Sequence, residues 1–322
     1  MTATQTPQTP PRPGSGRAAV TQPATNRNAL HRTGAWARRM PLLPALILVI
    51  LMTQIPFVTT IVISFMNWNA YYPNDIYFAG FANYGYVLAD PDARSAILVT
   101  ALLTAAVVLL SLLGGLVMAL LLDRQFLGRG IVRTMMITPF LLVPIAAALL
   151  WKHAVYNPVY GLLNGVLTWV FGAGAPQPDW ISQWPFWSVV IAIVWQWTPF
   201  MMLILLAGLQ SRPLDVVEAA RIDGANAWQI FIHMTLPHLR PFIELAGLLG
   251  AINIVQNFDH VFTITSGGLG TANLPYFIYQ TFYTAHDYGI ASAAGVIVVL
   301  GTIIIAMFAL RTVLSLFKEE AR

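Results

Sequence analysis

Six apolar runs dominate this sequence, and their length decides the solvent in which the chain folds. Each is near the roughly 20 residues that a helix needs to cross the hydrocarbon core of a bilayer. Only 9% of the residues are charged, against about 25% in soluble domains, which is too few to cover a water-exposed surface. The sequence therefore predicts an all-α membrane protein with six transmembrane helices, located in the plasma (inner) membrane and in contact with membrane lipid. The runs cover 42–66, 95–122, 131–151, 186–209, 242–258 and 289–313.

Lysine and arginine fall almost entirely on one side of the predicted spans. They lie in the N-terminal segment, between the second and third runs, in 211–241 and at the C-terminus, whereas the other side carries only Arg94 and Lys152. The positive-inside rule therefore predicts that both termini and 211–241 are cytoplasmic. Because topology accounts for the basic balance, we expect no nucleic-acid partner.

The same pattern predicts one transmembrane domain between two cytoplasmic tails. Residues 1–40 contain Arg but no Asp or Glu and show no apolar periodicity, which is typical of a disordered basic tail. The predicted domain covers 41–316 and includes 211–241 as a cytoplasmic loop. Residues 317–322 form the predicted C-terminal tail.

The segment from Ser211 to Pro241 predicts two short helices joined by a glycine. The first carries a polar stripe, and Gly224 follows it where a helix C-cap needs a residue free to take positive φ. The second has an apolar face at helical spacing and is expected to end at Leu236-Pro237. Such an amphipathic pair between two membrane spans is suited to bind another protein. The polar stripe is Asp215, Glu218 and Arg221, and the apolar face is Trp228, Phe231, Ile232 and Thr235.

Residues for catalysis, nucleotide phosphate or metal do not appear in a recognisable pattern. The chain has no cysteine, and neither Lys152 nor Lys318 lies in a P-loop. His233 and His238 stand at i, i+5, which puts them on different faces of a helix. We therefore expect no catalytic residues, no metal site and no cofactor. Glu244 is the one acidic residue inside a span, and two roles remain open for it: a pair with Arg240 or a proton relay.

Three short motifs stand at fixed spacing within 211–241: Glu218-Ala219-Ala220, Asp223-Gly224-Ala225 and Leu236-Pro237. This spacing resembles the EAA loop of the permeases of ABC importers, although Met234 stands where that family usually has Ile or Val. The resemblance implies the type I fold of ABC importer permeases and a pair of coupling helices that dock on a separate ABC ATPase dimer. It also implies that this chain is not itself an enzyme.

A second set of residues resembles the carbohydrate class of these permeases. Phe258-Asp259, Thr265 and Gly267-Gly268 are similar to its F-D…T-x-G-G segment, with Leu269 in place of the usual Pro. The strings at 137–158 and 273–295 look most like sorbitol/mannitol-type polyol permeases. This resemblance implies import of a sugar or sugar alcohol together with a second permease subunit and an extracytoplasmic solute-binding protein.

Amide and aromatic side chains inside two spans predict a path for a neutral polyhydroxylated solute. The resemblance to maltose-type permeases places four of them at pocket positions: Gln196, Trp197, Phe200 and Asn257. The other two are Asn253 and Gln256. The alternative is that these polar groups form interhelical hydrogen bonds with the second permease. The alternative function is an ion-coupled secondary transporter of small neutral solutes, for which Glu244 is the only intramembrane carboxylate.

Overall fold

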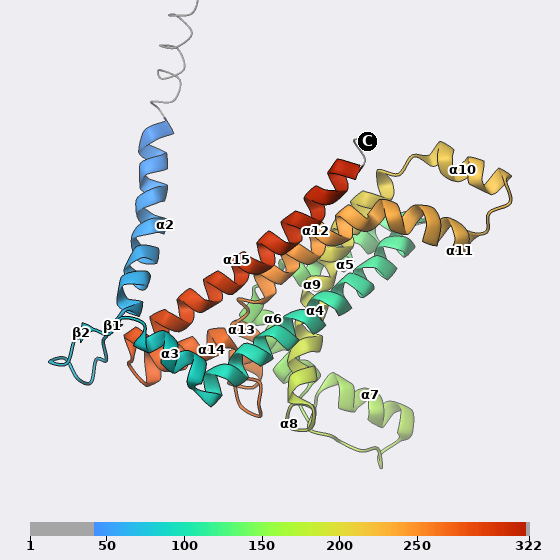
Figure 1. Cartoon of the computed structure of the whole chain (residues 1–322). Helices are drawn as coiled ribbons and strands as arrows, with labels where there is room; N and C mark the ends of the chain where they lie inside the picture. The colour runs from blue at the N-terminus through green and yellow to red at the C-terminus, as the bar shows by residue number, and fades with distance from the viewer. Residues whose placement is uncertain (1–41, 320–322) are drawn as a thin grey trace, which may run out of the picture. The chain divides into compact units, whose positions relative to one another are not determined.

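The computed structural model describes residues 42–319, and these residues are mostly helical (Figure 1). The tail predicted at 1–40 and the last three residues of the tail predicted at 317–322 lie outside the described residues. The chain divides into two compact units, Met1–Pro56 and Phe57–Arg322.

The described part of the first unit is the N-terminal portion of one apolar helix, α2 (Leu43–Ser64). Its side chains from 42 to 56 are all exposed, and Leu48 and Met52 are among the most exposed. A helix that is apolar on every side is stable in lipid or against other apolar surfaces, not in water.

The second unit starts with the end of α2 and a two-stranded antiparallel sheet in which Met66 lies opposite Phe78. Four of its helices are long and the others are short, and the long ones run alongside one another (Figure 1). The elements up to α9 are β1 (Met66–Asn67), β2 (Tyr77–Phe78), α3 (Ala82–Ala89), α4 (Pro91–Asp123), α5 (Arg129–Leu141), α6 (Pro144–Leu150), the π-helix η2 (Trp151–Val155), α7 (Leu162–Phe171), α8 (Trp180–Gln183) and α9 (Pro185–Gln210). The later elements are α10 (Leu214–Ile222), α11 (Ala227–Ile230), the π-helix η3 (Phe231–Thr235), α12 (Leu236–Ile254), α13 (Asp259–Ile264), α14 (Leu274–Tyr279), the π-helix η4 (Gln280–Thr284) and α15 (Tyr288–Glu319).

Membrane-length helices occur where the first, second and fourth apolar runs predict them. Within 42–319, α2, α4 and α9 are each long and apolar enough to cross a membrane. The helices α5 and α6–η2 together form a fourth candidate that is bent by 100°. The fifth and sixth runs correspond to α12 and to the apolar part of α15, so the count of six spans stays a prediction.

The break in the third run has a local cause in its two prolines. Pro144 disfavours the helical conformation at the preceding residue, and Val143 accordingly is extended, with ψ of 133°. Leu142 is extended as well, with ψ of 142°. Pro139 lies inside α5 and supplies no backbone N–H for the helix. The chain therefore changes direction between α5 and α6.

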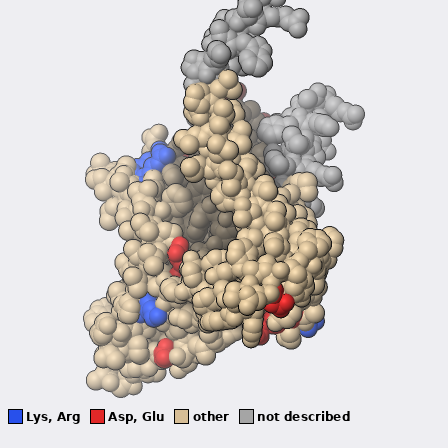
Figure 2. Space-filling model, turned by 90° about the vertical axis from the view of Figure 1, so that its left-hand side faces the viewer, with Lys and Arg blue, Asp and Glu red and all other residues tan. Residues whose placement is uncertain are grey.

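The core of the second unit lies between α4, α9 and α12. The helix α9 packs most extensively on α4, and α12 packs on both. One cluster of buried side chains joins the three helices, and it includes Leu122, Leu205 and Leu239. A second cluster joins α4 and α9 to α13 through Leu103, Ile193 and Val261. Figure 2 shows few charged side chains on the face it displays, as expected for a surface in contact with lipid.

The close approach of α4 to α9 depends on Gly115. A Cβ at this position would lie 2.8 Å from the Met202 backbone nitrogen and 2.9 Å from the Met201 Cβ, so the two helices would have to separate. We expect Gly115→Ala to destabilise the chain by about 1–3 kcal/mol, the usual effect of overpacking. The measurement is the midpoint of thermal unfolding in detergent. Gly247→Ala is the control, because its Cβ would meet Leu112 at an ordinary 3.5 Å, and equal midpoints for the two variants would contradict this account.

Candidate functional site

The turn between α10 and α11 is a C-terminal helix cap built on Gly224. Gly224 has φ of +88°, which confirms the positive φ that the sequence predicts. Its N–H donates to the Arg221 carbonyl at 3.1 Å, and the Ala225 N–H donates to the Ala220 carbonyl at 3.0 Å. This pair of bonds is the Schellman motif. A Cβ on Gly224 would meet no atom within 4 Å, so backbone conformation alone requires glycine here.

Glu218 lies on the exposed surface of α10. Its carboxylate makes no hydrogen bond or ion pair within the part of the chain that the structure describes, and the cap at Gly224 uses backbone atoms only. Ala219 is exposed beside it and Ala220 is half-buried, whereas Val217 is buried. The acidic side chain is therefore available to a partner and does not brace the turn.

The second helix of the pair begins at a capping box. The Asn226 side chain accepts from the Gln229 N–H at 2.9 Å, and the Gln229 side chain accepts from the Asn226 N–H at 2.8 Å. The spacing N-x-x-Q carries this signal, and our sequence analysis did not use it. The cap sets the direction in which α11 leaves the turn.

The prediction that Leu236-Pro237 ends the second helix is wrong. The chain passes from α11 through η3 directly into α12, and Pro237 lies in the first turn of α12. The π-turn from Phe231 to Thr235 replaces the usual hydrogen-bond pattern immediately before the proline, with the Leu236 N–H donating to the Phe231 carbonyl. A widened turn of this kind gives room for a proline and its missing N–H inside a helical path. The pair is thus continuous with a long helix of the core.

The base of the pair is held by Arg212, which our sequence analysis counted only as a charge. Its guanidinium donates to the Thr235 hydroxyl at 2.6 Å and lies 3.8 Å from the Asp123 carboxylate at the end of α4. His238 bonds the Gly208 carbonyl at 3.1 Å from α12. These contacts join the start and end of 211–241 to the ends of α4 and α9.

The tip of the pair exposes large apolar side chains. Ile222 is 86% exposed and Trp228 is 68% exposed, and the Trp228 ring stacks on Phe231 with centroids 5.8 Å apart. A cleft of about 380 Å³ lies beside them. Exposed apolar groups next to a cleft are typical of a surface that a protein partner covers. The cleft is lined by Asp223, Gly224, Ala225, Gln229, Ile230, His233 and Met234.

Gln196 connects α9 to the broken third span. It is buried, and its Nε2 donates to the Leu142 carbonyl at 2.8 Å, at the point where α5 ends. Its Oε1 is buried without a hydrogen-bond partner among the described residues. The Gln196 NH₂ group thus bonds the Leu142 carbonyl, which has lost its helical partner at the break. The Gln196 Oε1 is available to accept a hydrogen bond from a further donor.

Aromatic rings surround the same break. Trp197 and Phe200 contact each other and also Phe140 of α5, with ring centroids 5.2–5.6 Å apart. Phe140 was not predicted, because only its position in space relates it to α9. The three rings form one apolar wall beside Gln196.

The other three predicted residues lie at the end of α12 and in the turn after it, because α12 ends at Ile254 and contains only Asn253 of the three. Asn253 and Gln256 are exposed, and their hydrogen bonds within the described residues go to the α12 carbonyls of Leu249 and Ile252. Asn257 contacts His260 at 3.1 Å, and its carbonyl accepts from Asn273. Its Oδ1 is buried and unpaired within 42–319. No hydrogen bond within the described residues joins this group to Gln196.

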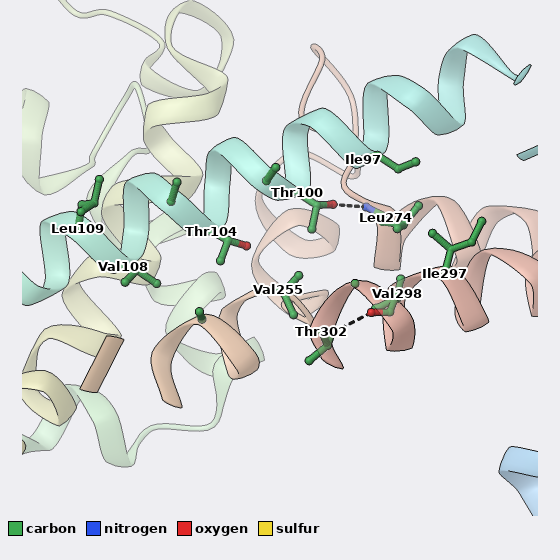
Figure 3. Close-up of a pocket in the computed structure, with 14 residues that line it drawn as sticks. Ile97, Thr100, Thr104, Val108, Leu109, Val255, Leu274, Ile297, Val298 and Thr302 are labelled. Carbon is green, nitrogen blue, oxygen red and sulfur yellow. Dashed lines mark hydrogen bonds between the residues drawn. The ribbon is translucent and has the colours of Figure 1, made fainter. Parts of the chain in front are cut away.

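A large apolar cavity lies away from these residues, between α4, α12 and α15 (Figure 3). Its volume is about 540 Å³, and Leu274 of α14 closes part of it. Thr100 accepts from the Leu274 N–H at 2.7 Å, and Thr302 bonds the Val298 carbonyl at 2.8 Å. The Thr104 hydroxyl is buried without a partner among the described residues. None of the six predicted path residues lines this cavity.

We expect Gln196→Leu to lower stability, because it leaves the Leu142 carbonyl unpaired at the break. The cost of such an unsatisfied group is about 1–3 kcal/mol. The measurement is again the thermal midpoint in detergent. Gln256→Leu is the matched control, since Gln256 is exposed and its amide bonds only the Ile252 carbonyl, at 3.3 Å. A Gln196→Leu midpoint equal to that of Gln256→Leu would show that the bond to Leu142 contributes nothing.

The fold and the exposed helix pair together define a class of protein. A membrane protein with many helices that exposes such a helix pair between two of its long helices is typical of a transporter component that binds another protein through the pair. The chain belongs to the family described as binding-protein-dependent transport system inner membrane component, whose family model matches residues 111–315. It is therefore a multi-pass permease of the plasma (inner) membrane, and the matched range contains the whole of 211–241.

Curated relatives agree with this assignment. The chain is 36% identical to a probable ABC transporter permease protein, y4oQ, of Sinorhizobium fredii, over 78% of this chain and 81% of the relative. It is 33% identical to the trehalose transport system permease protein SugA of Mycobacterium tuberculosis, over 79% and 81%. It is 35% identical to the trehalose/maltose transport system permease protein MalF of Thermococcus litoralis, over 80% and 86%.

A solved structure has the same fold. A chain of a bacterial ABC transporter involved in the import of the acidic polysaccharide alginate superposes with a TM-score of 0.76, at 21% sequence identity. The match covers 89% of this chain and 98% of that chain. The fold expected for an ABC importer permease is thereby confirmed.

Proposed function

We propose that this chain is a permease subunit of an ATP-driven importer of a sugar or sugar alcohol, and that 211–241 binds the ATPase that drives it. The observation that carries the proposal is the rigid helix pair around Gly224. Its cap and its capping box are formed within the pair and Arg212 bonds Thr235 at its base, while Glu218 and Trp228 are exposed. A surface that is ordered by its own contacts and leaves a carboxylate and an indole free is prepared for a protein partner.

The partner proposed for this surface is one subunit of an ABC ATPase dimer. The motifs that resemble the EAA loop are distributed over the whole pair. Glu218-Ala219-Ala220 lies on α10, Asp223-Gly224-Ala225 forms the turn, and Leu236-Pro237 begins α12. Because η3 continues into α12, a movement of the helix pair would be transmitted to the core through one continuous helical segment. ATP hydrolysis in the partner would bias the equilibrium between inward- and outward-facing states along this route.

The complete importer would contain two further partners. A second permease subunit would complete the translocation path, and an extracytoplasmic solute-binding protein would deliver the solute. The exposed apolar side chains of α4 and α9, such as Leu113 at 62% and Ile191 at 46%, are available to lipid or to that second permease. The proposed topology has six spans, cytoplasmic termini and a cytoplasmic 211–241.

The proposed solute class rests on the relatives and on the chemistry of two groups of side chains. Two relatives are named for trehalose or maltose transport. The α9 segment carries an amide oxygen at Gln196 that is unpaired among the described residues and a pair of aromatic rings at Trp197 and Phe200, the kinds of group that suit a neutral polyhydroxylated solute. Asn257 offers a second oxygen that is unpaired among the described residues, and Asn253 at the end of α12 and Gln256 just after it are exposed. Within this class we favour polyols, because 137–158 and 273–295 resemble polyol permeases.

Transport in proteoliposomes tests the function. The full-length chain, with the subunits that co-purify with it, is expected to take up radiolabelled trehalose, maltose, sorbitol or mannitol only with ATP and the solute-binding protein. Ionophores should have no effect on the rate. Uptake that needs an ion gradient and no ATP would overturn the proposal. Competition by sorbitol and mannitol but not by trehalose would identify the polyol class.

Glu244 supports this function over an ion-coupled transporter. Its Oε1 lies 3.0 Å from the Arg240 Nε one turn earlier in α12, the pairing that the sequence left open beside a proton relay. A carboxylate that is paired with a guanidinium on its own helix already has a fixed partner, which favours the structural role over a site for a carried ion.

A further inference from the structure

The helix α7 buries an asparagine while most of its apolar side chains are exposed, which is the reverse of a helix on a water-exposed surface. Asn164 is 1% exposed. Its Nδ2 donates to the carbonyls of Pro158 and Pro178 at 3.0 and 3.1 Å, and its Oδ1 accepts from the Trp180 indole at 2.7 Å. Thr168, one turn later, donates to the Asn164 carbonyl and accepts from Gln177. The two hydrogen-bonding side chains of this helix are thus used to hold the segment 157–180 together.

The opposite face of α7 is apolar and exposed. Trp169 is 86% exposed, Leu162 is 62% and Val166 is 48%, and Phe171 at the C-terminal end of the helix is 70% exposed. No charged residue occurs in the 25 positions from Ala154 to Pro178. An aqueous surface segment of this length would ordinarily carry charges, and contiguous exposed apolar groups on it would be unfavourable in water.

The position of α7 places this face near a membrane boundary. The chain enters the segment from η2, at the end of the bent span α5–α6–η2, and leaves it through α8 into the long helix α9. It lies at the end of the second unit opposite α10 and α11 (Figure 1). With ten residues the helix is about 15 Å long, half of what is needed to cross the hydrocarbon core. It is therefore unable to span the bilayer.

Charge returns where the segment ends. Asp179 caps α8, and its carboxylate accepts from the Ser182 hydroxyl at 2.6 Å and from the Ser182 backbone N–H. These hydrogen bonds lower the pKa of the Asp179 carboxyl. An ionised carboxylate next to a charge-free apolar helix marks a boundary between water and an apolar medium.

We propose that α7 is an interfacial helix whose apolar face inserts into the phospholipid headgroup boundary at the end of the bundle opposite 211–241. Exposed Trp169, Tyr160 and Phe171 are the side chains enriched at that depth. A free amphipathic helix turns its polar face to water, whereas in α7 Asn164 is buried and bonds the loop that the helix closes. A docked protein is the poorer occupant, because protein interfaces have a polar rim and this segment has no charge with which to form one.

Spin labelling tests the occupant directly, because the natural chain has no cysteine. Leu162→Cys, Val166→Cys and Trp169→Cys each carry one nitroxide on the exposed face. The full-length chain, with its co-purifying subunits, is placed in nanodiscs of phosphatidylcholine and phosphatidylglycerol. Collision of the label with oxygen reports lipid, and collision with a water-soluble nickel chelate reports water. We expect high oxygen collision and several-fold lower nickel collision than at Asn74→Cys, an exposed position between β1 and β2.

Two outcomes would overturn the proposal. Nickel collision as high as at Asn74→Cys would place α7 in water, and low collision with both reagents would show a protein covering it. Uptake by the labelled variants shows that the transporter is intact. Because three positions are labelled, the test still works if one variant does not fold. The inference needs the chain only to be in a membrane, so a failed uptake test of the proposed solute leaves it standing.

Discussion

Replacing Glu218 with alanine is expected to reduce ATP-driven uptake by about thirtyfold or more while the chain stays in the membrane at its normal level. The carboxylate is exposed and makes no bond within the described residues, so its removal costs the fold little. At the proposed interface it would be a charged hydrogen-bonding group, and loss of such a group typically costs 2–5 kcal/mol. The measurements are uptake in proteoliposomes and the amount of ATPase that co-purifies with the chain.

Asp215→Ala is the matched control for this result. Asp215 is also an exposed acidic residue of α10, one turn earlier, and it lies in the first turn of the helix. Its loss should cost only the 0.3–1 kcal/mol of a charge at a helix N-terminus. Normal uptake by Glu218→Ala, or equal losses in both variants, would remove the specific role proposed for Glu218.

Replacing Gly224 with valine is expected to lower uptake at least about tenfold, which corresponds to ~1.4 kcal/mol. The φ of +88° is strongly disfavoured for a β-branched residue. To avoid it, the cap must open and lose the bonds from the Gly224 and Ala225 N–H groups. The helix α11 would then leave α10 in another direction, and the two halves of the proposed ATPase surface would no longer fit one partner.

A graded series separates this backbone effect from steric crowding. Gly224→Asn should keep a substantial part of the uptake, because Asn tolerates the left-handed conformation better than valine does. Gly165→Val should behave as wild type, since its Cβ would also meet no atom within 4 Å and its φ is not positive. Equal uptake by the Asn and Val variants at 224 would contradict the requirement for positive φ.

Local patterns predicted the parts of this protein that depend on neighbouring residues. The long apolar helices follow from uninterrupted runs of apolar residues, because a spanning helix satisfies its own backbone hydrogen-bonding groups and needs only apolar side chains on its outside. The turn at Gly224 follows from a polar helix that stops at a glycine. The pair between Arg240 and Glu244 follows from a spacing of four residues on one helix.

Contacts between distant residues decided what the sequence analysis missed or predicted wrongly. The third span was expected to be one helix, but it is bent by 100°, and a glutamine 54 residues away bonds the carbonyl at its break. Leu236-Pro237 was expected to end a helix, and the π-turn at 231–235 instead lets the helix continue into α12.

The sequence by itself determined the membrane class, the family resemblance and the helix–glycine–helix pattern of 211–241. These features depend only on the composition of the chain, the helical periodicity of its apolar residues and the spacing of its motifs. Only the tertiary structure decided that this pair is anchored by Arg212 to Thr235 and Asp123, that Glu218 has no partner among the described residues, and that α7 turns its apolar face outward. The physical reason is that a side chain's partners are set by which helices pack together. That packing sums many weak contacts between residues far apart in the chain, and no local pattern records it.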